Sequence, residues 1–226
     1  MNKLIIFDLD GTLVQTYYSD DNSYLSALNE IIPINPNYKY WQDCEHLTDS
    51  AIFHHIFQKV ENRNPTEEEI KIMQEKFINR LQKKHIEHPA FFEEIPGAVQ
   101  AMQMLVESNL KVGVATGGWR RIAEFKLQKA NFNFSKVKVI GSDEHFSKYD
   151  FVTALIEDYK AHLEVDEFEY ICYVGDSLYD YRVSRQMGID FIGVDFKKNN
   201  MLKKEGVEKL ITDFTDFELF RSQLSF

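Results

Sequence analysis

Short runs of apolar residues recur along the chain, and most of them hold too few polar side chains to leave one face in water. Runs of this kind are typical of the central strands of a parallel sheet. We also expect one edge strand near the end of the chain, over Val207–Ile211. The central strands are predicted over Lys3–Phe7, Lys111–Ala115, Val137–Ile140, Tyr170–Val174 and Asp190–Val194.

Amphipathic stretches of ten or more residues separate these strands. Strands that alternate with such stretches indicate βαβ units, with helices on both faces of one sheet. The predicted fold is therefore α/β, with a Rossmann-like parallel sheet as its core. We expect its helices over Gly97–Ser108, Trp119–Ala130, Tyr149–His162, Leu178–Met187 and Asp216–Leu224.

The interval between the first two predicted strands is too long for a single βαβ connection. Roughly a hundred residues separate the first strand from the second, whereas one crossover with its helix needs only about thirty. The pattern predicts an inserted helical segment over Asn22–Ile31, Asp49–Val60 after a Thr48 cap, and Glu67–His88 after a Thr66 capping box. We expect a core of residues 1–15 and 90–226 and a helical cap of residues 16–89. Such an insertion is either a decorative lobe or a lid over the site.

Composition narrows the function classes. The formal net charge of −10 disfavours nucleic-acid binding. The sequence holds no apolar run of transmembrane length, and Asp8 and Asp10 interrupt the first apolar stretch before a signal peptide is complete. We therefore expect no membrane partner and a cytoplasmic location. Cys44 and Cys172 lie far apart without a metal-binding motif, and we expect both to be buried thiols.

Polar residues follow four of the five central strands. Ligands of open parallel sheets bind outside the carboxyl ends of the strands, so these residues are candidates for chemistry. Clustered carboxylates cannot all stay ionised without a cation, and hard oxygen ligands favour Mg²⁺. The candidates are Asp8 and Asp10 after the first strand, Thr116 and Gly117 after the second, Lys148 after the third, and Asp176 and Asp180 after the fourth.

In its order of motifs the chain resembles the haloacid dehalogenase superfamily, in the branch of phosphatases and phosphoglucomutase-like proteins with a helical cap after the first motif. The motifs that carry the resemblance are Asp-Leu-Asp-Gly-Thr from Asp8, Thr116, Lys148, and Gly-Asp-Ser-x-x-Asp up to Asp180. It implies hydrolysis of a small phosphorylated metabolite with Mg²⁺, through an aspartyl-phosphate. It also implies that the cap lies over the active site and selects the substrate.

The resemblance also implies a role for each candidate. Asp8 attacks phosphorus and binds the metal, and Asp10 is the general acid and base whose main-chain carbonyl also binds Mg²⁺. Thr116 and the Gly117 amide hold the phosphoryl oxygens, and Lys148 balances their charge. Asp176 is a further metal ligand, supported by Asp180.

Each candidate also has a purely structural interpretation. Thr116 and Ser177 are suitable helix caps, and Lys148 is followed by Tyr149 where the family often has proline. Lys126 and Lys129 lie in mid-helix and are poorer candidates for the motif lysine. The aromatic residues Tyr17, Tyr18 and Trp41 fit either the cleft or the interior of the cap. For Trp119, Arg120 and Arg121, a packed Trp beside two solvated Arg side chains is favoured over a second site for an anionic group of the substrate.

Several functions share this core. A phosphosugar mutase would use the same residues, whereas a dehalogenase would lack Asp10. A phosphonate-cleaving relative would need a Schiff-base lysine in the cap, where no lysine has a distinguishing context. A non-catalytic binding module has no need of four converging groups. The substrate and the oligomeric state stay open at this point.

Overall fold

The computed structural model describes residues 2–16, 19–35 and 40–226. Its centre is one six-stranded, all-parallel sheet in the order β3-β2-β1-β4-β5-β6. The strands are β1 (Lys3–Phe7), β2 (Lys111–Ala115), β3 (Lys138–Ile140), β4 (Tyr170–Gly175), β5 (Asp190–Val194) and β6 (Leu210–Ile211). The predicted fold class is confirmed. The strand order reverses direction between β1 and β4, which makes this the switch point where a ligand crevice is expected.

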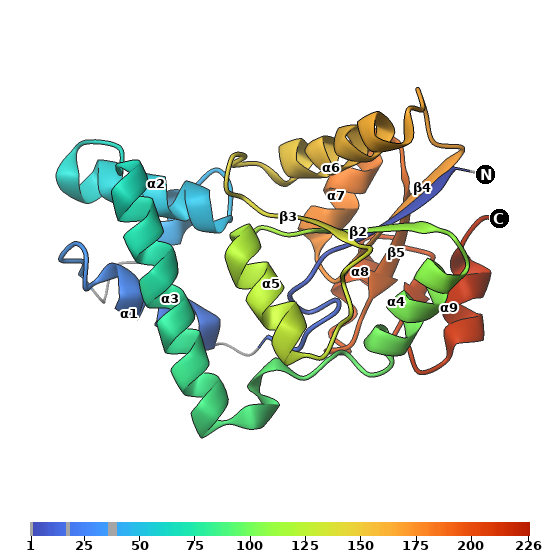
Figure 1. Cartoon of the computed structure of the whole chain (residues 1–226), viewed down its shortest axis with the longest axis horizontal. Coiled ribbons are helices and arrows are strands. Elements are labelled where there is room, and N and C mark those ends of the chain that lie inside the picture. Colours follow the sequence, from blue (N-terminus) through green and yellow to red (C-terminus); the bar gives the residue numbers. More distant parts are fainter. Residues whose placement is uncertain (1, 17–18, 36–39) are drawn as a thin grey trace.

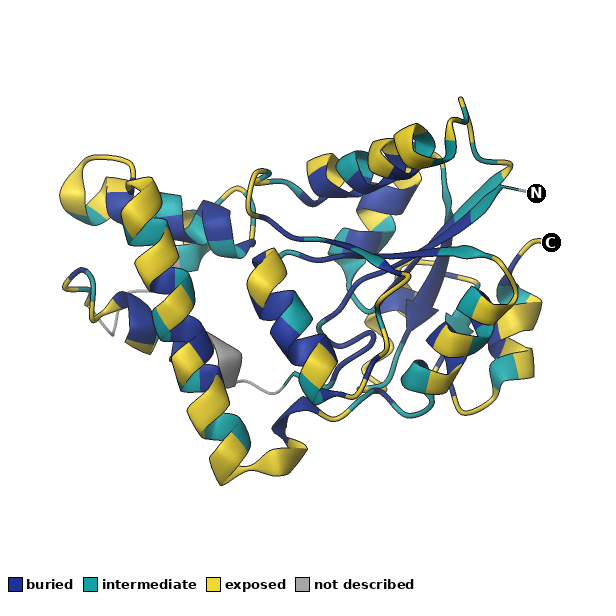
Figure 2. Cartoon of the chain, viewed as in Figure 1, coloured by how far each residue is buried: buried dark blue, intermediate teal, exposed yellow. Residues whose placement is uncertain are grey.

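Helices cover both faces of the sheet, as Figure 1 shows. They are α4 (Ala98–Glu107), α5 (Arg120–Lys129), α6 (Lys148–Leu163), α7 (Leu178–Met187), α8 (Met201–Lys204) and α9 (Phe217–Gln223). Alternate residues of β1 enter two hydrophobic clusters: Ile5 and Phe7 pack on the side of α4, α5 and α9, and Leu4 and Ile6 on the side of α6. Figure 2 shows the strands buried between helices whose outer sides are exposed.

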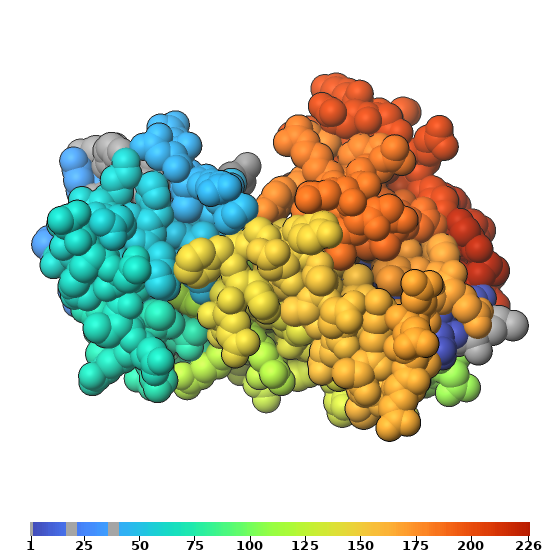
Figure 3. All heavy atoms as spheres, turned by 90° about the horizontal axis from the view of Figure 1, so that it is seen from above, coloured from blue at the N-terminus to red at the C-terminus, as the bar shows by residue number. Residues whose placement is uncertain are grey.

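A group of helices precedes α4 and lies beside the sheet. It comprises α1 (Ser19–Leu28), the 3₁₀ turn η1 (Tyr40–Asp43), α2 (Asp49–Glu61), α3 (Glu67–Glu87) and the turn η2 (Pro89–Phe92). We call α1, α2 and α3 the inserted helices. The predicted Thr48 cap of α2 and the Thr66 capping box of α3 are both formed. In Figure 3 these helices form a lobe, blue to cyan, that is separated by a notch from the orange part of the core.

The inserted helices leave and rejoin the core side by side. Gln15 N–H donates to the Glu93 carbonyl at 2.8 Å, and Ile95 N–H donates to the Leu13 carbonyl at 2.8 Å. Val14 forms an antiparallel bridge with Glu94 between these two hydrogen bonds. The two connections are therefore tied together beside the segment that carries Asp8 and Asp10.

Some sequence-based details need correction. The first inserted helix spans Ser19–Leu28 rather than Asn22–Ile31, because the chain turns after Leu28 ahead of Pro33. The edge strand is only Leu210–Ile211, since Val207 N–H donates to the Leu202 carbonyl at the end of α8. Both cysteines are free, but only Cys172 is buried; Cys44 is half-buried in the turn before α2.

No helix within the described ranges combines the length and the apolar character that crossing a bilayer requires. Tyr17 and Tyr18 lie outside the described residues, as does Lys39, one of the cap lysines that a phosphonate-cleaving relative could use. Trp41 is half-buried near the start of η1.

Candidate active site

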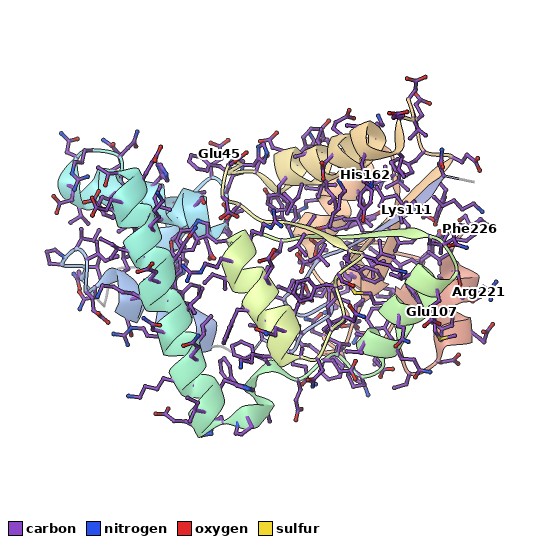
Figure 4. The ribbon with its side chains drawn as sticks, in the orientation of Figure 1. Glu45, Glu107, Lys111, His162, Arg221 and Phe226 are labelled. Atoms are coloured by element: carbon purple, nitrogen blue, oxygen red, sulfur yellow. The ribbon has the colours of Figure 1, made fainter. Side chains whose placement is uncertain are left out.

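The carboxyl ends of the strands face the inserted helices. In Figure 4, Lys111 at the start of β2 lies toward the far end of the molecule, whereas Glu45, just before α2, lies on the side of the inserted helices. Phe7 of β1 pairs in register with Val114 of β2 and with Val174 of β4. The residues that follow these three strands therefore meet at one edge of the sheet.

Asp8 lies at the centre of this edge. Its main-chain N–H donates to the Val174 carbonyl at 2.9 Å, which continues the β1–β4 ladder by one residue. Its side chain is only 8% exposed, and Oδ1 accepts a hydrogen bond from Lys148 Nζ at 2.8 Å. Burial raises the pKa of Asp8 well above its ordinary value, and the negative charges of Asp180 and Asp176 add to the rise against the opposing effect of Lys148.

Lys148 is the first residue of α6 and is buried among the carboxylates. Its Nζ also lies 2.5 Å from Asp180 Oδ1. Burial opposes the charge of this ammonium, but the nearby carboxylates of Asp180 and Asp8 outweigh that effect and raise the pKa of Lys148. The structure thus brings the predicted lysine into direct contact with Asp8, although Tyr149 stands where the family often has proline.

Asp180 combines two tasks in one buried side chain. Its Oδ2 accepts from the Ser177 N–H at 2.9 Å, and Ser177 Oγ accepts from the Asp180 N–H at 3.2 Å, so the pair forms the capping box of α7. Its Oδ1 accepts from Lys148 and, at 3.1 Å, from the Tyr173 hydroxyl. Ser177 therefore caps α7, as the structural interpretation expected, and Asp180 lies in the site at the same time.

Asp176 completes an acidic group. One carboxylate oxygen each from Asp8, Asp176 and Asp180 lie within 4.8 Å of one another. Burial, followed by the charge of Asp180, raises the pKa of Asp176 to about 6. The exposed Lys197 lies 3.7 Å from Asp176 Oδ2. Three carboxylates thus lie close together, and one buried ammonium pairs with two of them. Oxygen donors with this excess of negative charge suit a hard divalent cation.

Asp10 points to a different partner. Its Oδ1 accepts from Lys126 Nζ at 2.7 Å and from the Thr16 hydroxyl at 2.7 Å. Lys126 belongs to α5, the helix that follows β2, and is one of the two mid-helix lysines, with Lys129, that were poorer candidates for the motif lysine on sequence grounds. The buried apolar neighbours of Lys126 on α5 were the available signal, because a lysine among Ile122, Ala123, Phe125 and Leu127 is not on a solvated face.

The loop after β2 carries Thr116 and Gly117. Thr116 is buried, and its hydroxyl accepts from the Gly118 N–H at 3.2 Å. Thr116 does not cap α5, because the N-cap position is Trp119 and has no side-chain cap. The Gly117 carbonyl accepts from the Asp49 N–H at 2.8 Å, which brings the start of α2 directly onto this loop.

Trp119 and its neighbours follow the structural interpretation. Trp119 is fully buried and stacks on Tyr24 of α1, with ring centroids 5.8 Å apart. Its indole Nε1 donates to Ser50 Oγ of α2 at 2.7 Å. Arg120 pairs with Glu124 at 2.8 Å, and Arg121 lies 3.9 Å from Glu75. This segment therefore holds the inserted helices against the core.

The fold and these side chains define a Rossmann-like α/β protein with an acidic site at its topological switch point. The chain belongs to the haloacid dehalogenase-like hydrolase family, whose model matches residues 5–194. The resemblance inferred from the motifs is thereby confirmed.

Known proteins resemble the chain in sequence and in fold. The pyrophosphatase PpaX of Bacillus cereus is 30% identical over 143 residues, which are 62% of this chain and 61% of the relative. A predicted phosphoglycolate phosphatase from Haemophilus somnus shares the fold with a TM-score of 0.66 at 17% identity, over 97% of this chain and 98% of the other. A β-phosphoglucomutase from the archaeon Pyrococcus has a TM-score of 0.54 at 17% identity, over 98% of each chain. The alignment with PpaX thus spans about three-fifths of that relative's length.

Proposed function

We propose that the chain hydrolyses a small-molecule phosphomonoester with Mg²⁺ as cofactor, through an aspartyl-phosphate on Asp8. The observation that carries this proposal is the buried Asp8 carboxylate, which lies 2.8 Å from Lys148 Nζ within a group of acids. A carboxylate nucleophile beside a fixed positive charge is suited to phosphoryl transfer, where the protein mainly positions groups and neutralises charge.

The residues at this edge fit a magnesium ion. The carboxylates of Asp8 and Asp176 and the main-chain carbonyl of Asp10 would hold it, and the excess of negative charge over the single buried Lys148 supports this assignment. When bound, the ion supplies positive charge to the phosphoryl oxygens. Asp180 pairs with Lys148 and so holds it in place, and it supports the proposed metal ligands as a neighbour in the next layer of side chains.

The proposed reaction has two steps. First, an Asp8 oxygen bonds to phosphorus while the bond from phosphorus to the leaving oxygen breaks, and Asp10 gives its proton to that oxygen. Second, water attacks the aspartyl-phosphate and gives a proton to Asp10, which frees the Asp8 carboxylate and releases phosphate. Thr116, the Gly117 amide and Lys148 bind the phosphoryl oxygens in both steps.

We also propose a division into a catalytic core of residues 1–15 and 90–226 and a cap of residues 16–89. The contact of Asp49 and Ser50 with the loop after β2 supports it, because the cap then borders the phosphate-binding residues. A cap in this position suits a small metabolite better than a protein or a nucleic acid, and the net charge of −10 agrees with that choice. The cytoplasmic location stays a prediction from the sequence.

The test is phosphate release from a panel that includes sugar phosphates, phosphoglycolate, pyrophosphate and an aryl phosphate. We expect release with Mg²⁺, none with EDTA, and a loss of at least about 10³-fold in Asp8→Asn. Asp166→Asn, an exposed aspartate in the loop after α6, is the matched control and should keep full activity. Turnover that survives in Asp8→Asn or in EDTA would refute the proposal, and an isomeric sugar phosphate as product would identify a mutase instead.

A further inference from the structure

Lys126 is a buried lysine for which the reaction described so far has no use. Its side chain is 4% exposed, and its Nζ lies 2.7 Å from Oδ1 of Asp10. The two residues are 116 positions apart in the chain, so the fold itself creates this contact. Lys126 comes from α5, whereas the motif lysine Lys148 comes from α6.

The burial of Lys126 is asymmetric. The Asp10 side chain is 34% exposed and can be hydrated without a partner, whereas the ammonium of Lys126 cannot. A buried charge costs several kcal/mol of desolvation, and an apolar side chain of similar size is often at least as stable at such a position. Ile122 and Ala123, one turn before Lys126 on α5, and the adjacent Phe125 and Leu127 are all apolar and buried. Stability alone therefore does not account for a lysine here.

The geometry around Asp10 suggests what the lysine does. Lys126 and the Thr16 hydroxyl both donate to Oδ1, each at 2.7 Å, and so fix one carboxyl oxygen from two directions. The main chain is held as well, because Gly11 N–H donates to the Val14 carbonyl at 2.8 Å. A carboxyl group held by one oxygen has its second oxygen in a defined position.

We propose that Lys126 is a positioning residue that orients the Asp10 carboxyl group for proton transfer to the leaving oxygen. This inference rests on the proposed phosphatase function and adds to it. In this role Lys126 acts on the reaction through Asp10, not on phosphorus or on the leaving group directly. General acid catalysis contributes about 10²- to 10⁴-fold when the acid is well placed, and a displacement of about 1 Å can cost about 10²-fold.

Leaving-group dependence tests this role. The substrates are phenyl phosphate, whose leaving oxygen needs a proton, and 2,4-dinitrophenyl phosphate, whose leaving oxygen does not. In Lys126→Met we expect kcat/KM to fall about 10²-fold for phenyl phosphate and less than about threefold for the dinitrophenyl ester. Lys129→Met, three residues along the same helix, is the matched control, because Lys129 Nζ lies over the Phe125 ring rather than against Asp10. An equal loss for both esters, or no loss for either, would overturn the proposal.

A double-mutant cycle with Asp10→Asn separates positioning from folding. We expect Lys126→Met to cost nothing further in kcat/KM for phenyl phosphate once Asp10 is replaced. The shift of the urea midpoint caused by Lys126→Met should also be smaller in the Asp10→Asn background, a readout that needs no activity. Independent effects in both measurements would contradict the contact. An inactive wild type would instead overturn the phosphatase itself, which distinguishes the two failures.

Discussion

Charge balance governs the residues around Asp8. Three carboxylates and one buried ammonium leave the group of Asp8, Asp176, Asp180 and Lys148 with an excess of negative charge. Burial, together with the repulsion between the carboxylates, raises the pKa of Asp8 and the pKa of Asp176. The folded protein therefore holds protons on these two groups more tightly. Protons and a divalent cation therefore compete for the same oxygens.

Asp176 makes this competition measurable through stability. Its pKa is about 6 in the folded protein against 3.8 ordinarily, so the folded state binds more protons between these values, and stability falls as pH rises through this window. In EDTA we expect Asp176→Asn to be more stable than wild type, by about 1 kcal/mol more at pH 7 than at pH 5. Urea unfolding at the two pH values checks this, and the same difference at both would refute it.

Mg²⁺ should favour the wild-type protein at high pH, which is opposite to the effect of pH on its stability in EDTA. Mg²⁺ stabilises whichever state binds it, so it should raise the urea midpoint of wild type more at pH 7 than at pH 5. Asp176→Asn should lose most of this gain, because it lacks one proposed ligand. Midpoints that Mg²⁺ leaves unchanged at pH 7 would contradict the metal assignment.

Gly11 offers a second test at the scale of one residue. Its φ is +87°, and a Cβ atom there would lie 2.2 Å from Asp176 Oδ2. We expect Gly11→Ala to displace Asp176 and lower kcat/KM for an aryl phosphate by about 10²-fold. Gly206→Ala is the matched control, since Gly206 has a φ of +82° and nothing within 4 Å of the added Cβ. Both variants should lose stability, but only Gly11→Ala should lose activity; equal activities would exclude this role of Gly11.

Local pattern in the sequence was enough to place several candidate residues at the ends of strands. Asp8, Asp10, Thr116 and Asp176 each follow a recognisable strand, so their meeting at one edge of the sheet follows from parallel topology. Lys126 was missed, because its value depends on a contact across 116 positions that no local pattern encodes.

Elements were predicted well where polar residues mark their limits. The ends of β1, β2 and β5 agree with the sequence pattern, since a charged residue opens each apolar strand and a polar residue follows it. The ends of α7 agree because Ser177 caps its start and Gly188 ends it. The short helix α8 (Met201–Lys204) has too few residues to show a period and was not predicted. The position of α1 was shifted because Ile31 and Ile32 continue the apolar pattern into a turn.

The capping box of α3 gives a prediction for a whole helix. Thr66 Oγ1 accepts from the Glu69 N–H at 3.2 Å, and the Glu69 carboxylate accepts from the Thr66 N–H at 2.8 Å. We expect Thr66→Ala to lower the free energy of unfolding by about 1 kcal/mol and to leave phosphate release unchanged. Thr153→Ala is the control, because Thr153 donates to the Tyr149 carbonyl inside α6 and caps nothing. Equal losses in the two variants would show that the box contributes nothing.

At the scale of the molecule, the inserted helices and the core share one interior. A single hydrophobic cluster runs from Phe53, Phe57 and Phe77 of the inserted helices to Phe7 and Val114 of the sheet, and it includes Trp119. A continuous interior of this kind unfolds as one cooperative unit more readily than two lobes that meet through polar surfaces.

We therefore expect one urea transition for the whole chain. Tryptophan fluorescence reports from Trp119, at the contact of the two parts, and from Trp41, whereas circular dichroism reports from all helices. The two signals should give the same midpoint within error. A fluorescence change that precedes the loss of helix would show that the inserted helices detach first.

The paired connections at residues 13–15 and 93–95 have a consequence for how such proteins diversify. Because Gln15 and Leu13 bond to Glu93 and Ile95, the two ends of the segment between them lie next to each other whatever that segment contains. An ancestor could exchange this segment for a longer, shorter or unrelated one without reorganising the strands. Trp119 limits that freedom, since any replacement must offer a pocket for an indole ring or leave it in water.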